Sequence, residues 1–153
     1  MVKILFVCHG NICRSPMAEF IMKDLAAKYG LADMLEIKSA ATSSEEIGNG
    51  VYPPARKVLA KHNILCGGKT AVRMTEADYE YYDLIVVMDK NNLRNIRRAA
   101  GDDPKGKISM LMDYTDRPGE VADPWYTGDF ERTYKDIYEG CLGLLEVLKN
   151  EKM

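Results

Sequence analysis

The sequence lacks several features that would assign it to a large class of proteins. It contains no apolar run of the roughly 18 residues that a membrane-spanning helix needs. Its first segment, MVKILFVCHG, includes neither a signal-peptide apolar region of adequate length nor a small-residue cleavage site. We therefore expect a cytoplasmic protein without a membrane partner.

Long basic blocks are also absent, and the formal net charge is −2. This charge argues against a nucleic-acid partner held by bulk electrostatics. The densest basic cluster, Arg94, Arg97 and Arg98, has helical spacing, and we interpret it as a solvated helix face. With 153 residues, of which 46% are hydrophobic and 29% charged, the chain is expected to form one domain over residues 1–153.

Cysteine is scarce, and its spacing matches no metal or redox motif. The four cysteines, Cys8, Cys13, Cys66 and Cys141, form no C-x-x-C pair and no metal-ligand grouping with the two histidines. In a reducing compartment we expect them to be free thiols. The pattern therefore predicts no metal site.

Strand and helix patterns alternate along the chain. Short apolar runs predict strands over residues 3–8, 36–40, 83–88 and 107–111. Periodic apolar residues predict helices over residues 16–30, 54–62, 75–82, 91–100 and 129–149, with loops over 43–54 and 113–128. This alternation indicates a three-layer α/β fold, with a four-stranded parallel sheet covered by helices on both faces.

Several polar or reactive residues fall where the predicted strands end. Cys8, Ser39 and Asp89 lie at three carboxyl strand ends, and a long loop follows Leu111. Ligands of parallel α/β sheets bind at this edge. We therefore expect the functional residues to gather there.

The segment VCHGNICRSP connects the first predicted strand to the first predicted helix. Unpaired N–H groups at a helix N-terminus favour an anion, and a loop of this kind can turn further N–H groups inward. Gly10 and Asn11 tolerate backbone conformations that other residues resist. Arg14 adds a planar fork suited to two phosphate oxygens. The segment thus predicts a phosphate cradle.

We expect Cys8 at the bottom of this cradle, with Ser15 capping the helix and close enough to donate to the sulfur. The same surroundings stabilise a thiolate, the nucleophile that phosphoryl transfer through a covalent intermediate requires. The alternative is a buried cysteine at a strand end, with Arg14 paired elsewhere. The strand-loop-helix context favours the catalytic interpretation.

The motif C-x-G-N-I-C-R-S-P resembles the low-molecular-weight protein tyrosine phosphatases. Three further segments resemble that family, SAATSS at 39–44, VVMDKNNLRN at 86–95 and ADPW at 122–125, so the likeness covers nearly the whole chain. It implies a flavodoxin-like fold and hydrolysis of protein phosphotyrosine through a phosphocysteine on Cys8. It also implies phosphate binding by Arg14, catalysis without metal or cofactor, and phosphate or similar oxyanions as product or inhibitor.

Asp123 is the expected general acid. Asp-Pro alone is typical of a turn, but the resemblance matches Asp123 to the family residue that acts first as acid and then as base. Asp113, Asp116 and Asp129 are rivals without the Asp-Pro-aromatic context.

Behind the loop, Asn11 and Ser39 match positions that support it in the family, and Asp89 is expected beside them. Lys69, in GGKTAVR, stands where the family has a histidine. A lysine supplies only donors and a fixed charge, so support of the loop is expected to differ here.

The pocket mouth is expected to include His9, Ile12, Glu45, Trp125 and Tyr126 if the resemblance holds. An aromatic wall suits a phosphotyrosine ring, whereas a phosphoserine is too short to reach it. The alternative for the two aromatic residues is a loop anchor packed on the core. Glu45 departs from the bulky aromatic often found there and would repel acidic peptides.

Other interpretations stay open. A related branch dephosphorylates arginine and carries Thr at the position of Ile12, while arsenate reductases need two further cysteines close together. A phosphopeptide-binding module could keep the cradle without turnover. Cys13 is either a packing residue or the partner of Cys8 in a reversible disulfide.

Overall fold

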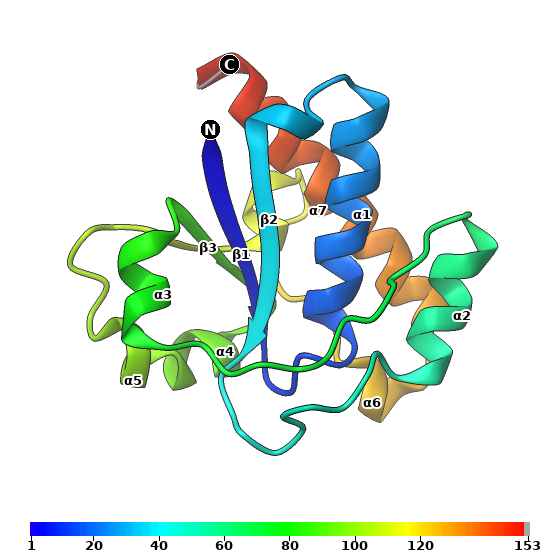
Figure 1. Cartoon of the computed structure of the whole chain (residues 1–153), viewed down its shortest axis with the longest axis horizontal. Coiled ribbons are helices and arrows are strands. Elements are labelled where there is room, and N and C mark those ends of the chain that lie inside the picture. Colours follow the sequence, from blue (N-terminus) through cyan, green and yellow to red (C-terminus); the bar gives the residue numbers. More distant parts are fainter. Residues whose placement is uncertain (152–153) are drawn as a thin grey trace.

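Residues 1–151 are described by the computed structural model, and they contain a parallel sheet of four strands (Figure 1). The strands are β1 (Val2–Cys8), β2 (Leu35–Ala41), β3 (Leu84–Val87) and β4 (Ile108–Met110), in the order β2-β1-β3-β4. All three pairings are parallel. The sheet predicted from the sequence is confirmed.

The central strand β1 is buried on both faces, as its continuous apolar run predicts. Successive side chains of a strand point to opposite faces. Ile4 and Phe6 accordingly enter one core, and Leu5 and Val7 enter the other.

Helices cover both faces of the sheet (Figure 1). One face carries α1 (Arg14–Lys28), α2 (Pro53–Lys61) and α7 (Phe130–Glu151). The other carries α3 (Glu76–Tyr81) and α5 (Arg97–Ala100), with α4 (Lys90–Asn95) leading into α5. A 3-10 turn, η1 (Ala32–Met34), precedes β2.

Two parts of the chain differ from the sequence prediction. Residues 91–100 form the end of α4 and all of α5 instead of one helix. The expected loop 113–128 contains the end of η2 (Leu111–Tyr114) and all of α6 (Pro124–Thr127). The start of α6 has a clear cause, because the Asp123 carboxylate caps it and Pro124 fits its first position.

The topology brings the carboxyl ends of β1, β2 and β3 to one edge of the sheet, the lower edge in Figure 1. The loop after β1, the start of α1 and the short helix α6 lie at this edge. Within the described residues, no helix is long and apolar enough to span a bilayer. His, Cys, Asp and Glu side chains of residues 1–151 form no cluster that could hold a metal ion.

Gly143 allows α7 to approach η2. A Cβ atom at Gly143 would lie 1.9 Å from the carbonyl oxygen of Tyr114, a backbone atom that cannot rotate away. We therefore predict that Gly143→Ala lowers the free energy of unfolding by about 2 kcal/mol, because α7 must move off η2. At a solvent-exposed helix position, where nothing obstructs the new methyl group, Gly→Ala would instead raise the free energy of unfolding by about 1 kcal/mol.

Urea denaturation measures this effect, with Glu146→Ala at an exposed position of α7 as the control. The control is expected to stay within about 0.5 kcal/mol of the wild type. A Gly143→Ala protein as stable as the wild type would contradict the close approach.

Candidate active site

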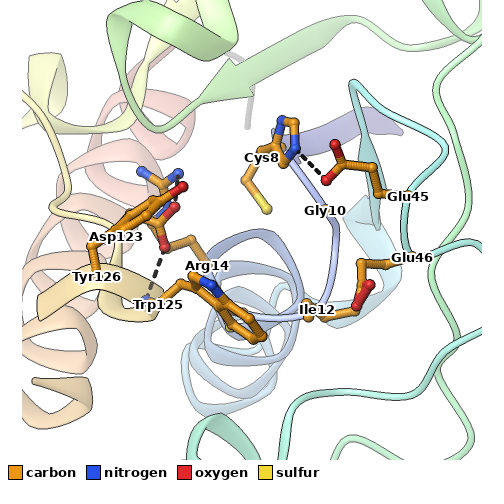
Figure 2. Close-up of a pocket in the computed structure, with 11 residues that line it drawn as sticks. Cys8, Gly10, Ile12, Arg14, Glu45, Glu46, Asp123, Trp125 and Tyr126 are labelled. Carbon is orange, nitrogen blue, oxygen red and sulfur yellow. Dashed lines mark hydrogen bonds and ion pairs between the residues drawn. The ribbon is translucent and has the colours of Figure 1, made fainter. Parts of the chain in front are cut away.

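A hollow of about 290 Å³, hereafter the active-site hollow, opens at the carboxyl edge of the sheet (Figure 2). Its lining comes from the loop after β1, the segment after β2, and the start of α6. The lining residues are Cys8, His9, Gly10, Ile12, Cys13, Arg14, Glu45, Glu46, Asp123, Trp125 and Tyr126. All of them except Glu46 were predicted from the sequence. Residues more than 100 positions apart in the chain thus meet in one place.

The first turn of α1 faces the sulfur of Cys8. The helix begins at Arg14 with Cys13 in the cap position, and no side chain caps it. The backbone N–H of Ser15 instead donates to Cys8 Sγ, with an N–S distance of 3.4 Å. Uncapped N–H groups carry the positive end of the helix dipole, so this geometry favours negative charge at the sulfur.

Ser15 is therefore not the helix cap that the sequence suggests. Its hydroxyl Oγ lies 3.0 Å from Cys8 Sγ and 3.4 Å from the carbonyl oxygen of Ala40. Since Asn11 Nδ2 donates to this Oγ at 2.7 Å, the hydroxyl hydrogen is available for the nearer sulfur. Ser15 is fully buried and absent from the lining of the hollow, so it acts on Cys8 from beneath the loop.

Asn11, rather than Gly10, has the unusual backbone of the loop. Its φ is 59°, in the left-handed region that asparagine tolerates better than most residues, whereas Gly10 has no positive φ. A Cβ on Gly10 would meet Glu46 Cγ at 3.4 Å, an ordinary contact. Neither the conformation of the loop nor its distance from Glu46 therefore requires a glycine at position 10.

Asn11 is buried and, like Ser15, lies behind the hollow and not in its lining. Its side chain holds the loop in place. Its Nδ2 donates to Ser15 Oγ and, at 3.0 Å, to Ser39 Oγ. Its Oδ1 accepts from the backbone N–H of Val72 at 3.1 Å. Both hydrogens and the oxygen of the amide are thereby satisfied, as burial requires.

The hydrogen-bond network continues to Glu19, which the sequence analysis missed. Ser39 Oγ donates to Glu19 Oε1 at 2.5 Å, and this bond leaves the Ser39 oxygen free to accept from Asn11. Lys23 Nζ donates to Glu19 Oε2 at 2.6 Å. The carboxylate of Glu19 is almost completely buried, so it needs these partners. One signal was available, because Ser15 and Glu19 are four residues apart on one helix.

Lys69 occupies the place expected for a histidine and supports the network from the other side. Its Nζ donates to the carbonyl oxygen of Ser39 at 2.8 Å and lies 3.7 Å from Glu19 Oε1. Burial lowers the pKa of Lys69, and the negative charge of Glu19 opposes that shift. Lys69 therefore fixes the backbone and the carboxylate, while Asn11 contacts only the two serines and Val72.

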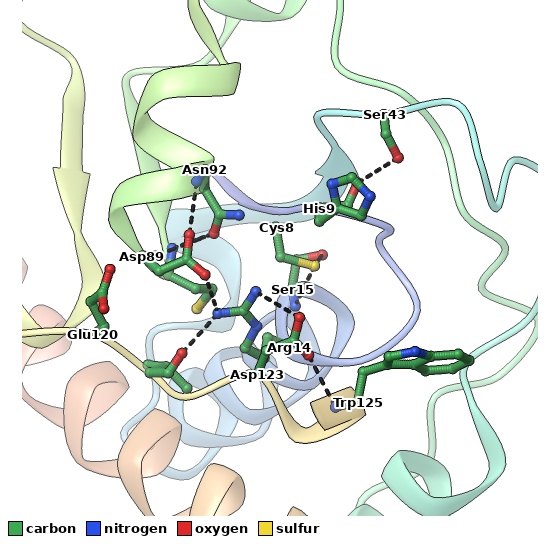
Figure 3. A network of polar contacts seen from close by, with 12 residues as sticks. Cys8, His9, Arg14, Ser15, Ser43, Asp89, Asn92, Glu120, Asp123 and Trp125 are labelled. Atoms are coloured by element: carbon green, nitrogen blue, oxygen red, sulfur yellow. Dashed lines mark hydrogen bonds and ion pairs between the residues drawn. The ribbon is translucent and has the colours of Figure 1, made fainter. Parts of the chain in front are cut away.

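Arg14 is buried and tightly oriented (Figure 3). Its Nη1 donates to Asp89 Oδ2 at 2.8 Å and to the carbonyl oxygen of Val121 at 2.7 Å. Its Nη2 lies 3.5 Å from Asp123 Oδ2. Burial would lower the pKa of Arg14, but the negative charges of Cys8, Asp123 and Asp89 outweigh burial and raise it. With Nη1 engaged, the edge formed by Nε and Nη2 is the part suited to two oxygens of a phosphate.

Asp89 is aimed at Arg14 by a second residue that the sequence analysis missed. Asp89 is the N-cap of α4, and its Oδ1 accepts from the backbone N–H of Asn92 at 2.7 Å. The Asn92 side chain in turn accepts from the backbone N–H groups of Met88 and Asp89. This reciprocal capping leaves Asp89 Oδ2 for the guanidinium.

Asp123 is the aspartate of the expected set that reaches the active-site hollow. Its Oδ1 accepts from the backbone N–H of Trp125 at 3.0 Å, which leaves Oδ2 toward Arg14. The rivals have other contacts. Asp113 accepts a backbone N–H at the start of η2, Asp129 accepts from Arg132 in the first turn of α7, and Asp116 is exposed outside the hollow.

The rim of the hollow has an aromatic side and a polar side (Figure 2). Trp125 and Tyr126 are 55% and 85% exposed, so neither is a core-packed anchor. Trp125 leans on Tyr52, with 4.9 Å between ring centroids, and the Tyr52 N–H donates to the Ile12 carbonyl. Tyr52 was not predicted.

On the polar side, His9 Nε2 and Glu45 Oε2 are 2.9 Å apart. This contact gives the Glu45 carboxylate a hydrogen-bond partner at the rim.

The two cysteines of the loop have different surroundings. Burial, followed by the negative charge of Cys8, raises the pKa of Cys13 to about 12, so Cys13 is a neutral thiol at physiological pH. All four cysteines of the described residues are free. A regulatory disulfide between Cys8 and Cys13 stays a prediction.

Comparison with known proteins identifies the family. A model of the low molecular weight phosphotyrosine protein phosphatases matches residues 3–153. The low molecular weight protein-tyrosine-phosphatase YfkJ of Bacillus subtilis is 40% identical and covers 99% of each chain. Its crystal structure gives a TM-score of 0.96 at 39% identity, covering 100% of this chain and 98% of YfkJ.

Two further relatives are informative. PtpA of Staphylococcus aureus, also named a low molecular weight protein-tyrosine-phosphatase, is 34% identical over 97% of this chain and 94% of its own. The arginine phosphatase DARP of Drosophila has a TM-score of 0.89 at 30% identity, covering 99% of this chain and 100% of its own.

The sheet order, the helical layers and these likenesses define a hydrolase with a flavodoxin-like fold, as expected from the sequence. The chain belongs to the low molecular weight phosphotyrosine protein phosphatase family. Members of this family act on phosphoproteins.

The buried network yields a prediction for Glu19. Glu19→Gln removes the charge between Lys23 and Lys69, and we expect it to lower the free energy of unfolding by about 3 kcal/mol, as breaking a buried ion pair does. Lys23→Gln is the matched control, because Lys23 is half-exposed and its loss should cost less than about 1 kcal/mol. Urea denaturation compares them, and equal stabilities of the two variants would refute the role of Glu19 as the buried anchor.

Proposed function

We propose that this protein hydrolyses phosphotyrosine in proteins, and aryl phosphates, through a phosphocysteine intermediate on Cys8. The observation that carries the proposal is the position of Cys8 Sγ, which receives the Ser15 N–H in a hollow that Arg14 and Asp123 also line. Family membership supports the substrate class. The four free cysteines fit a reducing compartment, which supports a cytoplasmic location.

The first step transfers the phosphoryl group to sulfur. The Nε–Nη2 edge of Arg14 and the N–H groups of the loop bind the phosphate oxygens, and the Cys8 thiolate attacks phosphorus. The bond between phosphorus and the tyrosyl oxygen breaks, and its electron pair stays on that oxygen. Asp123 in its acid form donates a proton there, so tyrosine leaves as a neutral phenol.

The second step regenerates the enzyme. The Asp123 carboxylate takes a proton from water as the water oxygen attacks phosphorus, and the S–P bond breaks. Inorganic phosphate leaves, and the electron pair of the S–P bond returns to Cys8 as a thiolate. The Ser15 N–H and hydroxyl stabilise that leaving thiolate, because both lie at the sulfur.

The rim supports an aromatic substrate. A phosphotyrosine side chain that places its phosphate against Arg14 would bring its ring between the Trp125–Tyr52 pair and the apolar side chain of Ile12. A phosphoserine is too short to make both contacts.

Phosphoarginine is the second candidate substrate, because the chain resembles an arginine phosphatase over nearly its whole length. Ile12 makes phosphoarginine the less favoured substrate, because an apolar side chain offers no hydrogen-bond acceptor to a guanidinium. Arsenate reduction is less well supported. It needs two further cysteines close together, and neither Cys66 nor Cys141 lines the active-site hollow.

Two substitutions test the chemistry. We expect Cys8→Ser to abolish hydrolysis of p-nitrophenyl phosphate, and Asp123→Asn to lower kcat by about 10²–10⁴-fold while phosphate still inhibits at a similar concentration. Asparagine keeps the side-chain oxygen that caps α6. The expected fall in kcat therefore measures the loss of proton transfer and not the loss of the helix cap. The wild-type rate is expected to be unchanged by EDTA.

Asp129→Asn is the matched control, because it makes the same change at a helix cap outside the hollow. Its kcat is expected to equal that of the wild type. An Asp123→Asn protein as fast as the wild type would remove Asp123 from the mechanism.

Substrate choice is tested at Ile12. We expect the wild type to have a higher kcat/KM for phosphotyrosine than for phosphoarginine, and Ile12→Thr to reduce that ratio because a hydroxyl then faces the substrate. Ile12→Val, which stays apolar, should keep the preference for phosphotyrosine, because it adds no hydrogen-bonding group. A wild-type preference for phosphoarginine would replace the proposed substrate by the second candidate.

A further inference from the structure

A second hollow, of about 380 Å³, adjoins the active-site hollow and is lined by four arginines, Arg73, Arg94, Arg97 and Arg98. We call it the arginine groove. Arg94 lies on α4, Arg97 and Arg98 lie on α5, and Arg73 forms an isolated parallel bridge with Ala41 at the end of β2. The sequence predicted an exposed helix face for Arg94, Arg97 and Arg98. The structure confirms their exposure and shows that they also line a concave surface.

The four arginines are not neutralised by neighbouring carboxylates. Within residues 1–151, the arginines that form ion pairs are Arg14, Arg117 and Arg132. Glu45 is the one carboxylate in the lining of the arginine groove, and it is already paired with His9. Glu76 lies in the neighbouring hollow that Arg73 and Arg98 share. In a chain of net charge −2, the groove is thus a concentrated patch of positive charge.

The groove and the active-site hollow have a common border. His9 and Glu45 line both of them, and Figure 2 shows Glu45 at the rim of the hollow that contains Cys8. A peptide with one side chain in the active-site hollow can therefore continue directly into the arginine groove.

We propose that the arginine groove binds the acidic segment of a phosphoprotein substrate, next to the phosphotyrosine that Cys8 attacks. Carboxylates of Asp or Glu beside the phosphotyrosine lie over the four arginines, which draw the substrate in and set its direction. This inference rests on the proposed function of the active site. It also reverses the expectation that Glu45 makes the rim repel acidic peptides, because the four arginines outweigh that one charge.

An acidic peptide is a better occupant than a nucleic acid. The groove holds a few side chains and continues into a pocket for one phosphorylated side chain, whereas a duplex needs a longer basic surface. Charge at such a rim acts mainly on the rate of association and on selectivity, so kcat/KM is the sensitive quantity.

The test measures kcat/KM of the 153-residue chain for three substrates. They are p-nitrophenyl phosphate and two phosphotyrosine peptides that are identical except for three flanking Glu residues, which are Gln in the second peptide. The variant is Arg94→Gln with Arg97→Gln. The control is Lys57→Gln with Lys135→Gln, which changes the net charge equally at exposed positions of α2 and α7, on the other face of the sheet.

We expect the wild type and the control to favour the Glu peptide by about tenfold in kcat/KM at low salt, and the arginine variant to favour it by less than about twofold. Hydrolysis of p-nitrophenyl phosphate should be equal in all three proteins. An arginine variant that keeps the full preference, or a control that loses it equally, would overturn the proposal.

Binding to Cys8→Ser separates this inference from the proposed function. If the wild type hydrolysed none of the three substrates, the proposed function would fail, and the groove would be judged by the affinities of the two peptides for Cys8→Ser. Tighter binding of the Glu peptide, lost on adding the arginine substitutions, supports the groove. Equal affinities, or a stronger competition by duplex DNA than by the Glu peptide, overturn it.

Discussion

The N-terminus of α1 points at the sulfur of Cys8, and the rest of the site depends on this contact. It requires the loop to turn back sharply, which the left-handed conformation of Asn11 achieves. The loop stays in that shape because the Asn11 side chain is saturated with buried hydrogen bonds, and because Glu19 fixes the direction of the bonds through Ser39. A carboxylate outside the pocket thereby orients the groups that stabilise charge within it.

The guanidinium of Arg14 is held in one orientation by residues that are distant from it in the sequence. Asp89 and the Val121 carbonyl hold one side of the guanidinium, so the other side is presented to the hollow without the loss of side-chain freedom that a mobile arginine would suffer on binding. Asp123 touches the same guanidinium and is held by the backbone of α6. Arg14, the proposed phosphate-binding group, and Asp123, the expected acid, are therefore positioned by one set of contacts.

Recognition of a substrate divides between two sides of the mouth. The Trp125–Tyr52 pair offers an apolar wall to a ring, and the arginine groove beyond His9 and Glu45 offers charge to the residues around it. The wall acts on the phosphorylated side chain and the groove on its neighbours. The two surfaces can therefore change independently, which would allow one catalytic site to serve different phosphoproteins.

The parallel sheet, the loop after its first strand and most of the pocket lining could be predicted from the sequence, because strand and helix patterns and the Cys8–Arg14 motif are local. Sequence reasoning did not find Tyr52, whose partner Trp125 lies on a separate element. It also missed Asn92, whose contacts with Asp89 are local but matter only because Asp89 meets Arg14 in space, and it misplaced the start of α1. The role of Glu19 at the end of a buried network could not be predicted, because a carboxylate on a helix becomes an anchor only when Ser39 and two lysines contact it in the folded chain. The same holds for the arginine groove, since helical spacing indicates an exposed face and not what lies beside it.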